Sequence, residues 1–116
     1  MIMNIRTAGH YRWGDVCDGW HLLNRPDLSV TQERIPPGAG EVRHYHGRAR
    51  QFFFVLSGQL EIELRDQVLS MSSGDSLEVP PGDAHRVRNT SHVAASFLVV
   101  SAPTTQGDRT NLEPPT

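Results

Sequence analysis

Three histidines and one glutamine have the types and spacing of a metal-ligand set. His44 and His46 are separated by one residue, and positions i and i+2 of a strand project from the same face. Gln51 follows across a short connection, so a hairpin could bring its amide beside the two imidazoles, and His85 adds a third imidazole. We predict that these side chains bind one divalent transition metal (Zn, Ni, Mn, Fe or Co) and leave room for water or substrate.

The spacing around these ligands is more specific than a His-x-His pair, which is common among exposed or core histidines. Two motifs closely resemble those of the cupin family and together extend over residues 38–89. The first contains Gly38, His44, His46, Gln51 and Gly58, and the second contains Gly74, Pro80, Pro81, Gly82, His85 and Asn89. The resemblance implies an all-β fold, a small antiparallel jelly-roll β-barrel, with the metal inside and His44, His46, Gln51 and His85 as its ligands.

At Gln51 the chain departs from the commonest cupin pattern, which has Glu at this position. With three neutral imidazoles and a carboxylate a divalent site carries one positive charge, whereas with Gln51 it carries two. The extra charge weakens metal affinity, makes bound water more acidic and disfavours oxidation of the metal. The sequence therefore favours Lewis-acid lyase or isomerase chemistry on a small oxygenated metabolite over metal-dependent dioxygenase chemistry. Some small cupins with Gln that this chain resembles act on sugar acids, and keto or diketo compounds fit the same chemistry.

The general base of such a reaction is not evident. The expected last strand, residues 94–100, contains no acid or histidine, so a base must come from elsewhere or be metal-bound hydroxide. Two alternatives therefore stay open. The barrel is a metal-containing module that binds or senses a small molecule without turnover, or it is a metal-free barrel.

Other residues are candidates for a substrate pocket. The aromatic candidates are Tyr11, Trp13, Trp20 and Phe53, although core packing explains them equally well. Arg48 could hold an anionic substrate, but a hairpin turn favours a solvated side chain. Asp108 and Arg109 follow the last expected strand and could fold back across a barrel mouth. His10, His21 and His92 lack ligand spacing, and we expect them at the surface.

The elements that must position these residues are short β-strands. After about residue 27, β-like runs are separated by Gly, Pro, Asn, Asp and Ser, and no stretch has the 3.6-residue period of a substantial helix. The expected strands are residues 28–35, 42–46, 52–56, 60–64, 67–71, 76–79, 85–88 and 94–100. Their spacing predicts one sandwich or barrel domain over residues 1–116.

Two flanking segments surround this domain core. Residues 9–26 contain three of the four Tyr and Trp residues and form either a lid or an added edge strand. Residues 102–116 are rich in Pro, Thr, Gly and Asn, and we expect a surface tail with disordered last residues.

The run Phe52–Leu56 is apolar on both faces, although a strand in a small barrel has only one inward face. With Gln51 inward, Phe53 and Val55 share its face and Phe52, Phe54 and Leu56 lie outside. A homodimer partner would cover them, or else residues 9–26 would.

Composition excludes several functions. The 116 residues carry a formal net charge of -2, so no basic field attracts nucleic acid or an anionic membrane. All 11 basic residues are arginines, which excludes lysine Schiff-base chemistry. One cysteine and no long apolar stretch predict a protein of a reducing cytoplasm, with a small molecule as its ligand.

Overall fold

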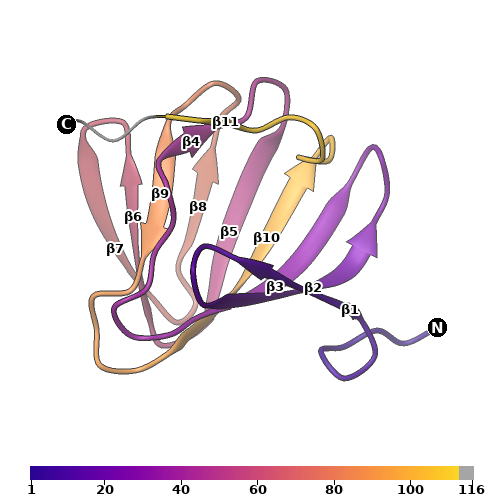
Figure 1. Cartoon of the computed structure of the whole chain (residues 1–116), viewed down its shortest axis with the longest axis horizontal. Helices are drawn as coiled ribbons and strands as arrows, with labels where there is room; N and C mark the ends of the chain where they lie inside the picture. The colour runs from indigo at the N-terminus through magenta and orange to yellow at the C-terminus, as the bar shows by residue number, and fades with distance from the viewer. Residues whose placement is uncertain (113–116) are drawn as a thin grey trace.

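Two antiparallel sheets form the structure, a computed structural model that describes residues 1–112. One sheet has the strand order β1-β2-β3-β10-β5-β8 and the other β11-β4-β9-β6-β7 (Figure 1). The strands are β1 (Gly9–Trp13), β2 (Cys17–Asn24), β3 (Ser29–Ile35), β4 (His44–Tyr45), β5 (Arg50–Ser57), β6 (Gln59–Leu64), β7 (Gln67–Ser72), β8 (Ser76–Val79), β9 (His85–Arg88), β10 (Ala95–Ala102) and β11 (Thr110–Asn111). The predicted all-β jelly roll is confirmed. In the described part of the chain, no helix is both long enough and apolar enough to cross a membrane.

The aromatic segment of residues 9–26 is an edge hairpin of the six-stranded sheet. β1 pairs with β2, and β2 pairs with β3, so the hairpin extends this sheet away from β5. The alternative in which this segment covers the outer face of β5 is therefore wrong. Phe52 and Leu56 stay 42% and 38% exposed on that face.

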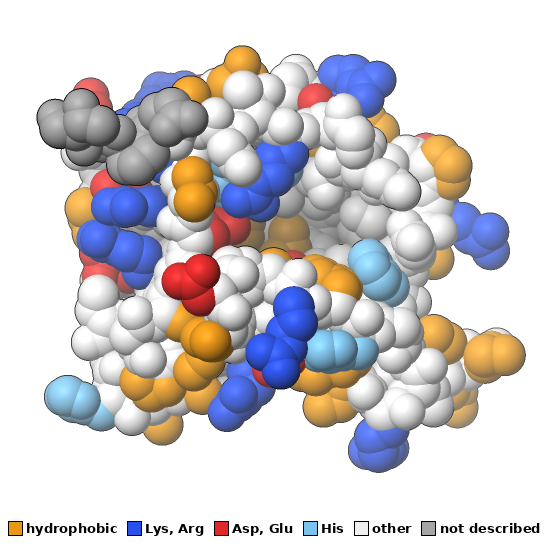
Figure 2. Space-filling view, in the orientation of Figure 1, with side chains coloured by type: hydrophobic (Ala, Val, Ile, Leu, Met, Phe, Trp, Pro, Cys, Tyr) orange, Lys and Arg blue, Asp and Glu red, His pale blue; other side chains and the backbone are white. Residues whose placement is uncertain are grey.

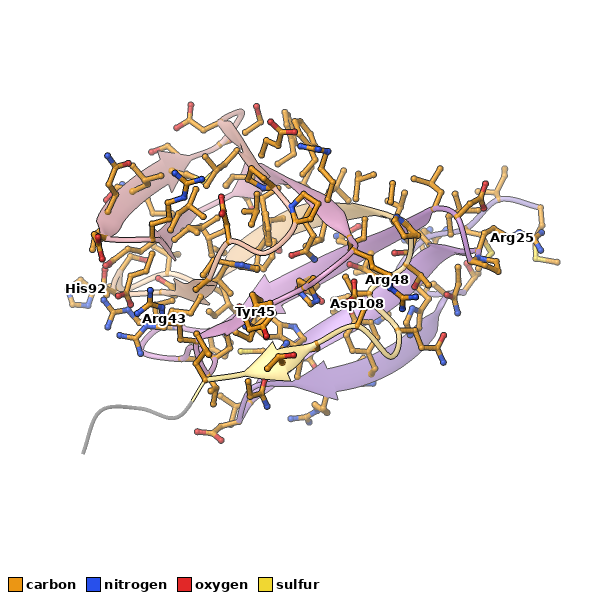
Figure 3. The ribbon with its side chains drawn as sticks, turned by 90° about the horizontal axis from the view of Figure 1, so that it is seen from above. Arg25, Arg43, Tyr45, Arg48, His92 and Asp108 are labelled. Carbon is orange, nitrogen blue, oxygen red and sulfur yellow. The ribbon has the colours of Figure 1, made fainter. Side chains whose placement is uncertain are left out.

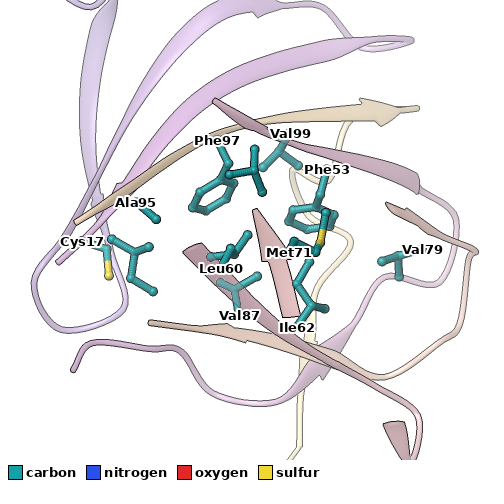
Figure 4. Packing of buried hydrophobic residues seen from close by; sticks show 12 residues of the cluster. Cys17, Phe53, Leu60, Ile62, Met71, Val79, Val87, Ala95, Phe97 and Val99 are labelled. Atoms are coloured by element: carbon teal, nitrogen blue, oxygen red, sulfur yellow. The ribbon is translucent and has the colours of Figure 1, made fainter. Parts of the chain in front are cut away.

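The inner face of the six-stranded sheet changes from polar to apolar along its strands. At one end the register places Ser101 between Ser29 and Gln51. Towards the other end, inward residues such as Phe97 and Val55 are fully buried. Figure 4 shows the apolar residues packed between the two sheets. Burying polar groups costs free energy unless they are hydrogen-bonded. The polar end is therefore the mouth of the barrel, and the apolar end is its floor.

The chain after β10 returns across the mouth of the barrel. β11 pairs with β4, with Thr110 opposite Tyr45 and Asn111 opposite His44. Figure 1 shows this segment crossing from the end of β10 to the side of β4. We call residues 104–112 the strap; none of them is fully buried, and the backbone of β11 completes the sheet edge at β4. The expected disorder of the last residues falls on 113–116, outside the described residues.

Candidate metal centre

The three predicted imidazoles meet inside the barrel mouth. His44 and His85 are paired across β4 and β9, and His46 lies two residues beyond His44. All three are buried, with 3%, 5% and 1% exposure for His44, His46 and His85. One ring nitrogen from each lies within 4.8 Å of the others, a separation that one metal ion can bridge.

Backbone carbonyls orient each ring. Nδ1 of His44 lies 2.9 Å from the carbonyl oxygen of Val42, and Nδ1 of His85 lies 2.9 Å from that of Asp83. Nδ1 of His46 lies 2.8 Å from the carbonyl oxygen of Asp108. A carbonyl oxygen only accepts, so each Nδ1 donates and each Nε2 keeps its lone pair for another partner.

Burial keeps these rings neutral. Desolvation is the largest cause lowering the pKa of all three, to about 3 for His44 and about 4 for His85. The neighbouring His85 ring lowers the pKa of His44 further. At neutral pH the three rings are therefore unprotonated donors, the form that binds a metal ion.

Gln51 adds a fourth donor. Its Nε2 donates to the Oγ of Ser101 at 3.2 Å, which leaves the amide oxygen free to face the imidazoles. Within the described residues, Gln51 Oε1 and His85 Nε2 are buried and have no hydrogen-bond partner. Buried acceptors are rarely left unsatisfied, so three neutral nitrogens and one amide oxygen fit a divalent transition metal. Sequence reasoning missed Ser101, whose only signal was its position two residues after Val99, on the same face of the strand.

Asp108 ties the strap to the ligand-bearing turn. Its carboxylate accepts the backbone N–H groups of Gly47, Arg48 and Ala49 at 2.9, 3.0 and 2.9 Å. Desolvation opposes ionisation of Asp108, but these hydrogen bonds prevail and its pKa is below the usual value. Figure 3 shows Asp108 beside Arg48 at this turn. The same residue therefore holds the turn by its side chain and His46 by its carbonyl, as the predicted fold-back across the mouth requires.

A cavity of about 470 Å³ opens from the ligand set. Figure 2 shows a hollow near the middle of the face of the molecule that it draws. The predicted pocket residues Tyr11, Trp13, Phe53 and Arg109 line the cavity. The hydroxyl-bearing residues of the wall are Tyr11, Ser29, Thr31, Ser101, Thr104 and Thr105. The wall can therefore hydrogen-bond an oxygen-rich molecule.

Three predicted pocket residues lie outside this cavity, and one of them is Asp108, whose carboxylate accepts the backbone N–H groups of residues 47–49. Trp20 falls on the outer face of the sheet, because β2 turns Cys17, Gly19 and His21 inward by strand alternation. The Arg48 side chain is 72% exposed and lies near Asp108, outside the cavity lining.

The three remaining histidines differ in position. His21 is half-buried and lines the cavity, so the expectation that it lies at the surface is wrong. His10 pairs with Asp18 at 2.7 Å, and His92 is exposed. Figure 3 places His92 at the far end of the molecule from Arg48.

Two acidic residues that sequence reasoning missed, Glu33 and Glu41, line the same cavity. Burial is the main cause raising the pKa of Glu33 to about 8 and that of Glu41 to about 7. Glu41 accepts the Val87 N–H at 3.1 Å and lies 3.6 Å from Nη2 of Arg109. Glu33 accepts a hydrogen bond from the Tyr11 hydroxyl. The acids absent from β10 are thus supplied by β3 and by the segment before β4.

Comparison with known proteins adds a family and a fold. The sequence pattern of the family described as Cupin domain matches residues 31–101. Protein SchB of Streptomyces halstedii is 33% identical over 64 residues, which cover 55% of this chain and 46% of SchB. The chain spans about half the length of the curated relatives that it matches.

Solved structures share the fold. The polyketide cyclase RemF of Streptomyces resistomycificus has a TM-score of 0.83 at 16% identity, covering 97% of this chain and 85% of RemF. A sugar phosphate isomerase from a cupin superfamily, from Silicibacter pomeroyi, has a TM-score of 0.75 at 26% identity, covering 88% of this chain and 75% of that protein. The two sheets are therefore the double-stranded β-helix that these structures share.

The lowered histidine pKa values predict that metal binding resists acid. A proton competes with the metal only when the pH falls towards the lowered pKa, about 4 for His85. We expect affinity for Zn²⁺, measured by chelator competition, to fall far less between about pH 6 and about pH 5 than ordinary imidazoles would allow. Three imidazoles with the ordinary pKa of about 6.5 would lose roughly several hundredfold over this range. A loss of that size would contradict neutral, desolvated rings.

The strap predicts that Asp108→Ala weakens metal binding although Asp108 is not a ligand. Without the three hydrogen bonds to residues 47–49, the strap carbonyl no longer holds His46 in place. We expect Zn²⁺ affinity to fall about 10-fold or more, as for other residues that orient a metal ligand. The control is Asp66→Ala, an exposed aspartate in the β6–β7 turn, which should bind as the unaltered chain does. Equal affinity in both variants would remove the strap from the metal centre.

Proposed function

This chain belongs to the cupin domain family, and on that premise we propose that it is a mononuclear-metal enzyme of a small oxygenated metabolite. His44, His46, His85 and Gln51 hold one divalent transition metal. The observation that supports this most strongly is the buried, unpartnered pair of acceptors, Gln51 Oε1 and His85 Nε2, beside two more neutral imidazoles. When bound, the metal supplies Lewis-acid polarisation of a substrate oxygen.

The residues of the chain support a lyase or isomerase of a sugar acid, keto or diketo compound. The cavity is of a size for a small molecule, and its wall offers several hydroxyl groups and the Arg109 guanidinium. Its two acids, Glu33 and Glu41, have raised pKa values and can exchange protons near neutral pH. These groups favour turnover over a module that only binds. The names polyketide cyclase and sugar phosphate isomerase describe enzymes of oxygenated molecules, which supports the same substrate class.

We also propose that the protein is a homodimer through the outer face of the six-stranded sheet. Phe52 and Phe54 of β5 lie beside Val100 and Leu98 of β10 on this face. The β1–β2 hairpin leaves the face uncovered. An apolar face that continues across two strands is typical of an interface.

The ligand assignment is tested by measuring metal affinity in three variants. His44→Ala should lower Zn²⁺ affinity at least about 100-fold, because one of four donors is lost. Gln51→Glu should raise it roughly tenfold or more, because the carboxylate adds a negative charge at the metal while desolvation offsets part of the gain. His92→Ala, which removes an exposed histidine, is the matched control.

Unchanged affinity in both His44→Ala and Gln51→Glu would overturn the metal site. Unchanged affinity in Gln51→Glu alone would remove Gln51 from the ligand set. It would also remove the reason, based on the neutral charge of Gln51, for favouring Lewis-acid chemistry. Incubation of the Zn²⁺-, Mn²⁺- and Ni²⁺-loaded protein with sugar acids, 1,3-diketones and small keto acids then tests turnover, and no product from any of them would favour the binding module.

The dimer is tested by sedimentation at micromolar concentration. We expect a dimer for the unaltered chain and a monomer for Phe52→Glu, because the new carboxylate would be buried without a partner. Val68→Glu is the control, since Val68 is 58% exposed on the other sheet. A monomeric unaltered chain would rule out this interface.

A further inference from the structure

Glu33 occupies an apolar row of the barrel interior. In the register of the six-stranded sheet it lies between Gly19 of β2 and Phe97 of β10, and Phe97 is next to Val55 of β5. Phe97 and Val55 are fully buried core residues. The row nearest the mouth is polar, so a carboxyl group here departs from the pattern of the sheet.

Tyr11 reaches Glu33 across a glycine. Tyr11 is opposite Gly19 on β2, and Gly19 is opposite Glu33 on β3. A Cβ atom at Gly19 would overlap the Tyr11 ring, so only glycine lets the ring lie flat over β2. The Tyr11 hydroxyl then donates to a carboxylate oxygen of Glu33. Three adjacent strands thus place the Tyr11 hydroxyl on one half-buried acid of the cavity wall.

Glu33 has fewer hydrogen-bond and ion-pair partners than Glu41, the second acid of the cavity. Glu41 has Arg109 and the Val87 N–H as partners, and its Oε1 lies 3.9 Å from Nδ1 of His44. Within residues 1–112 Glu33 has no ion-pair partner, and the Tyr11 hydroxyl is the one side-chain donor to it. A largely buried carboxyl without a cation costs stability, and Gln would accept the same hydrogen bond without that cost. The hydrogen bond therefore does not require Glu here, whereas only a carboxyl can take up and release a proton.

We propose that Glu33, positioned by Tyr11, is the group that exchanges a proton with carbon during catalysis, and that the substrate is a carbonyl compound with a C–H bond next to the carbonyl. This inference rests on the proposed metal-dependent function. The C–H bond breaks, its proton goes to a Glu33 carboxylate oxygen, and its electron pair forms the C=C bond of an enolate whose negative charge lies on the former carbonyl oxygen. Return of the proton to the same or a neighbouring carbon restores Glu33, and no oxidant or reductant is consumed.

The environment of Glu33 matches this task. Burial, the largest cause, raises its pKa to about 8, while the Tyr11 hydrogen bond lowers it. The other charged or titratable groups that act on it are Glu41, which raises its pKa, and Arg109, which lowers it. A base is most effective when its pKa is near the working pH.

The first test is deuterium uptake from D₂O into hydroxyacetone by the Zn²⁺-loaded protein, followed by proton NMR. Glu33→Gln should slow the exchange about 100-fold or more, the usual contribution of a general base. Its amide oxygen still accepts from Tyr11, so the thermal unfolding midpoint should not fall. Glu78→Gln, an exposed strand glutamate that pairs with Arg50, is the matched control and should exchange as the unaltered chain does.

The second test needs no activity and uses metal-free protein. In carboxyl ¹³C NMR, one glutamate resonance should titrate near pH 8, be absent in Glu33→Gln, and titrate about one pH unit higher in Tyr11→Phe, where the carboxylate loses its donor. This variant keeps the ring over Gly19, so the hairpin stays intact. The pH at which the deuterium exchange rate of Tyr11→Phe rises should be higher by the same amount.

The outcomes separate the two proposals. Equal exchange rates in the unaltered chain and Glu33→Gln, both with normal zinc content, overturn the role of Glu33 and leave the metal site intact. A Glu33 resonance at the ordinary glutamate pKa overturns it whether or not zinc binds. Absence of zinc binding in the unaltered chain overturns the proposed function, and the role of Glu33 fails with it.

Discussion

The neutrality of three buried imidazoles is the condition on which the rest of the site depends. Each ring is excluded from water, and each gives its one N–H to a backbone carbonyl. The three carbonyls belong to segments far apart in the chain, before β4, before β9 and in the strap. A change in any of these backbones would release a ring or change its tautomer. The sheet register and the strap therefore position the candidate metal centre as much as the histidines themselves do.

The barrel separates this polar centre from its core by a gradient along the strands. Ser29, Gln51 and Ser101 share a row at the mouth, and Phe97 and Val55 share a row further in. In the outer row the Gln51 amide nitrogen donates to Ser101 while the Gln51 oxygen has no hydrogen-bond partner, and close packing stabilises the inner row. Against this background the exceptions are informative: one orphaned oxygen points to a metal, and one acid among apolar residues points to proton transfer.

The sequence predicted what short-range patterns encode. Strand alternation placed His44 and His46 on the same face, and it placed Phe52 and Phe53 on opposite faces of their strand, both as found. It did not predict the partners that long-range register creates, such as Glu33 with Tyr11 or Gln51 with Ser101. Pairing across strands depends on which segments become neighbours, and no local period carries that information.

The same reason explains the misplaced residues of β2 and the strap contacts that the sequence did not predict. Trp20 and His21 exchange their expected positions because the inward face of β2 is set by its pairing with β3, which the sequence left open between a lid and an edge strand. The loop-like composition of the strap did not predict its contacts. Its position is fixed by the Asp108 carboxylate on three backbone N–H groups and by the pairing of β11 with β4.

The position of the acids gives the neutral ligand Gln51 a physical meaning. A carboxylate at position 51 would cancel charge at the metal and lower its power to polarise a substrate oxygen. In this chain the carboxyl groups stand on the cavity wall, at Glu33 and Glu41, where burial raises their pKa values towards neutrality. An acid on the wall can take up and return a proton, which a carboxylate bound to a metal does far less readily. In the proposed function, acids on the wall rather than in the ligand set would keep the metal a strong Lewis acid and would supply the base that its chemistry needs.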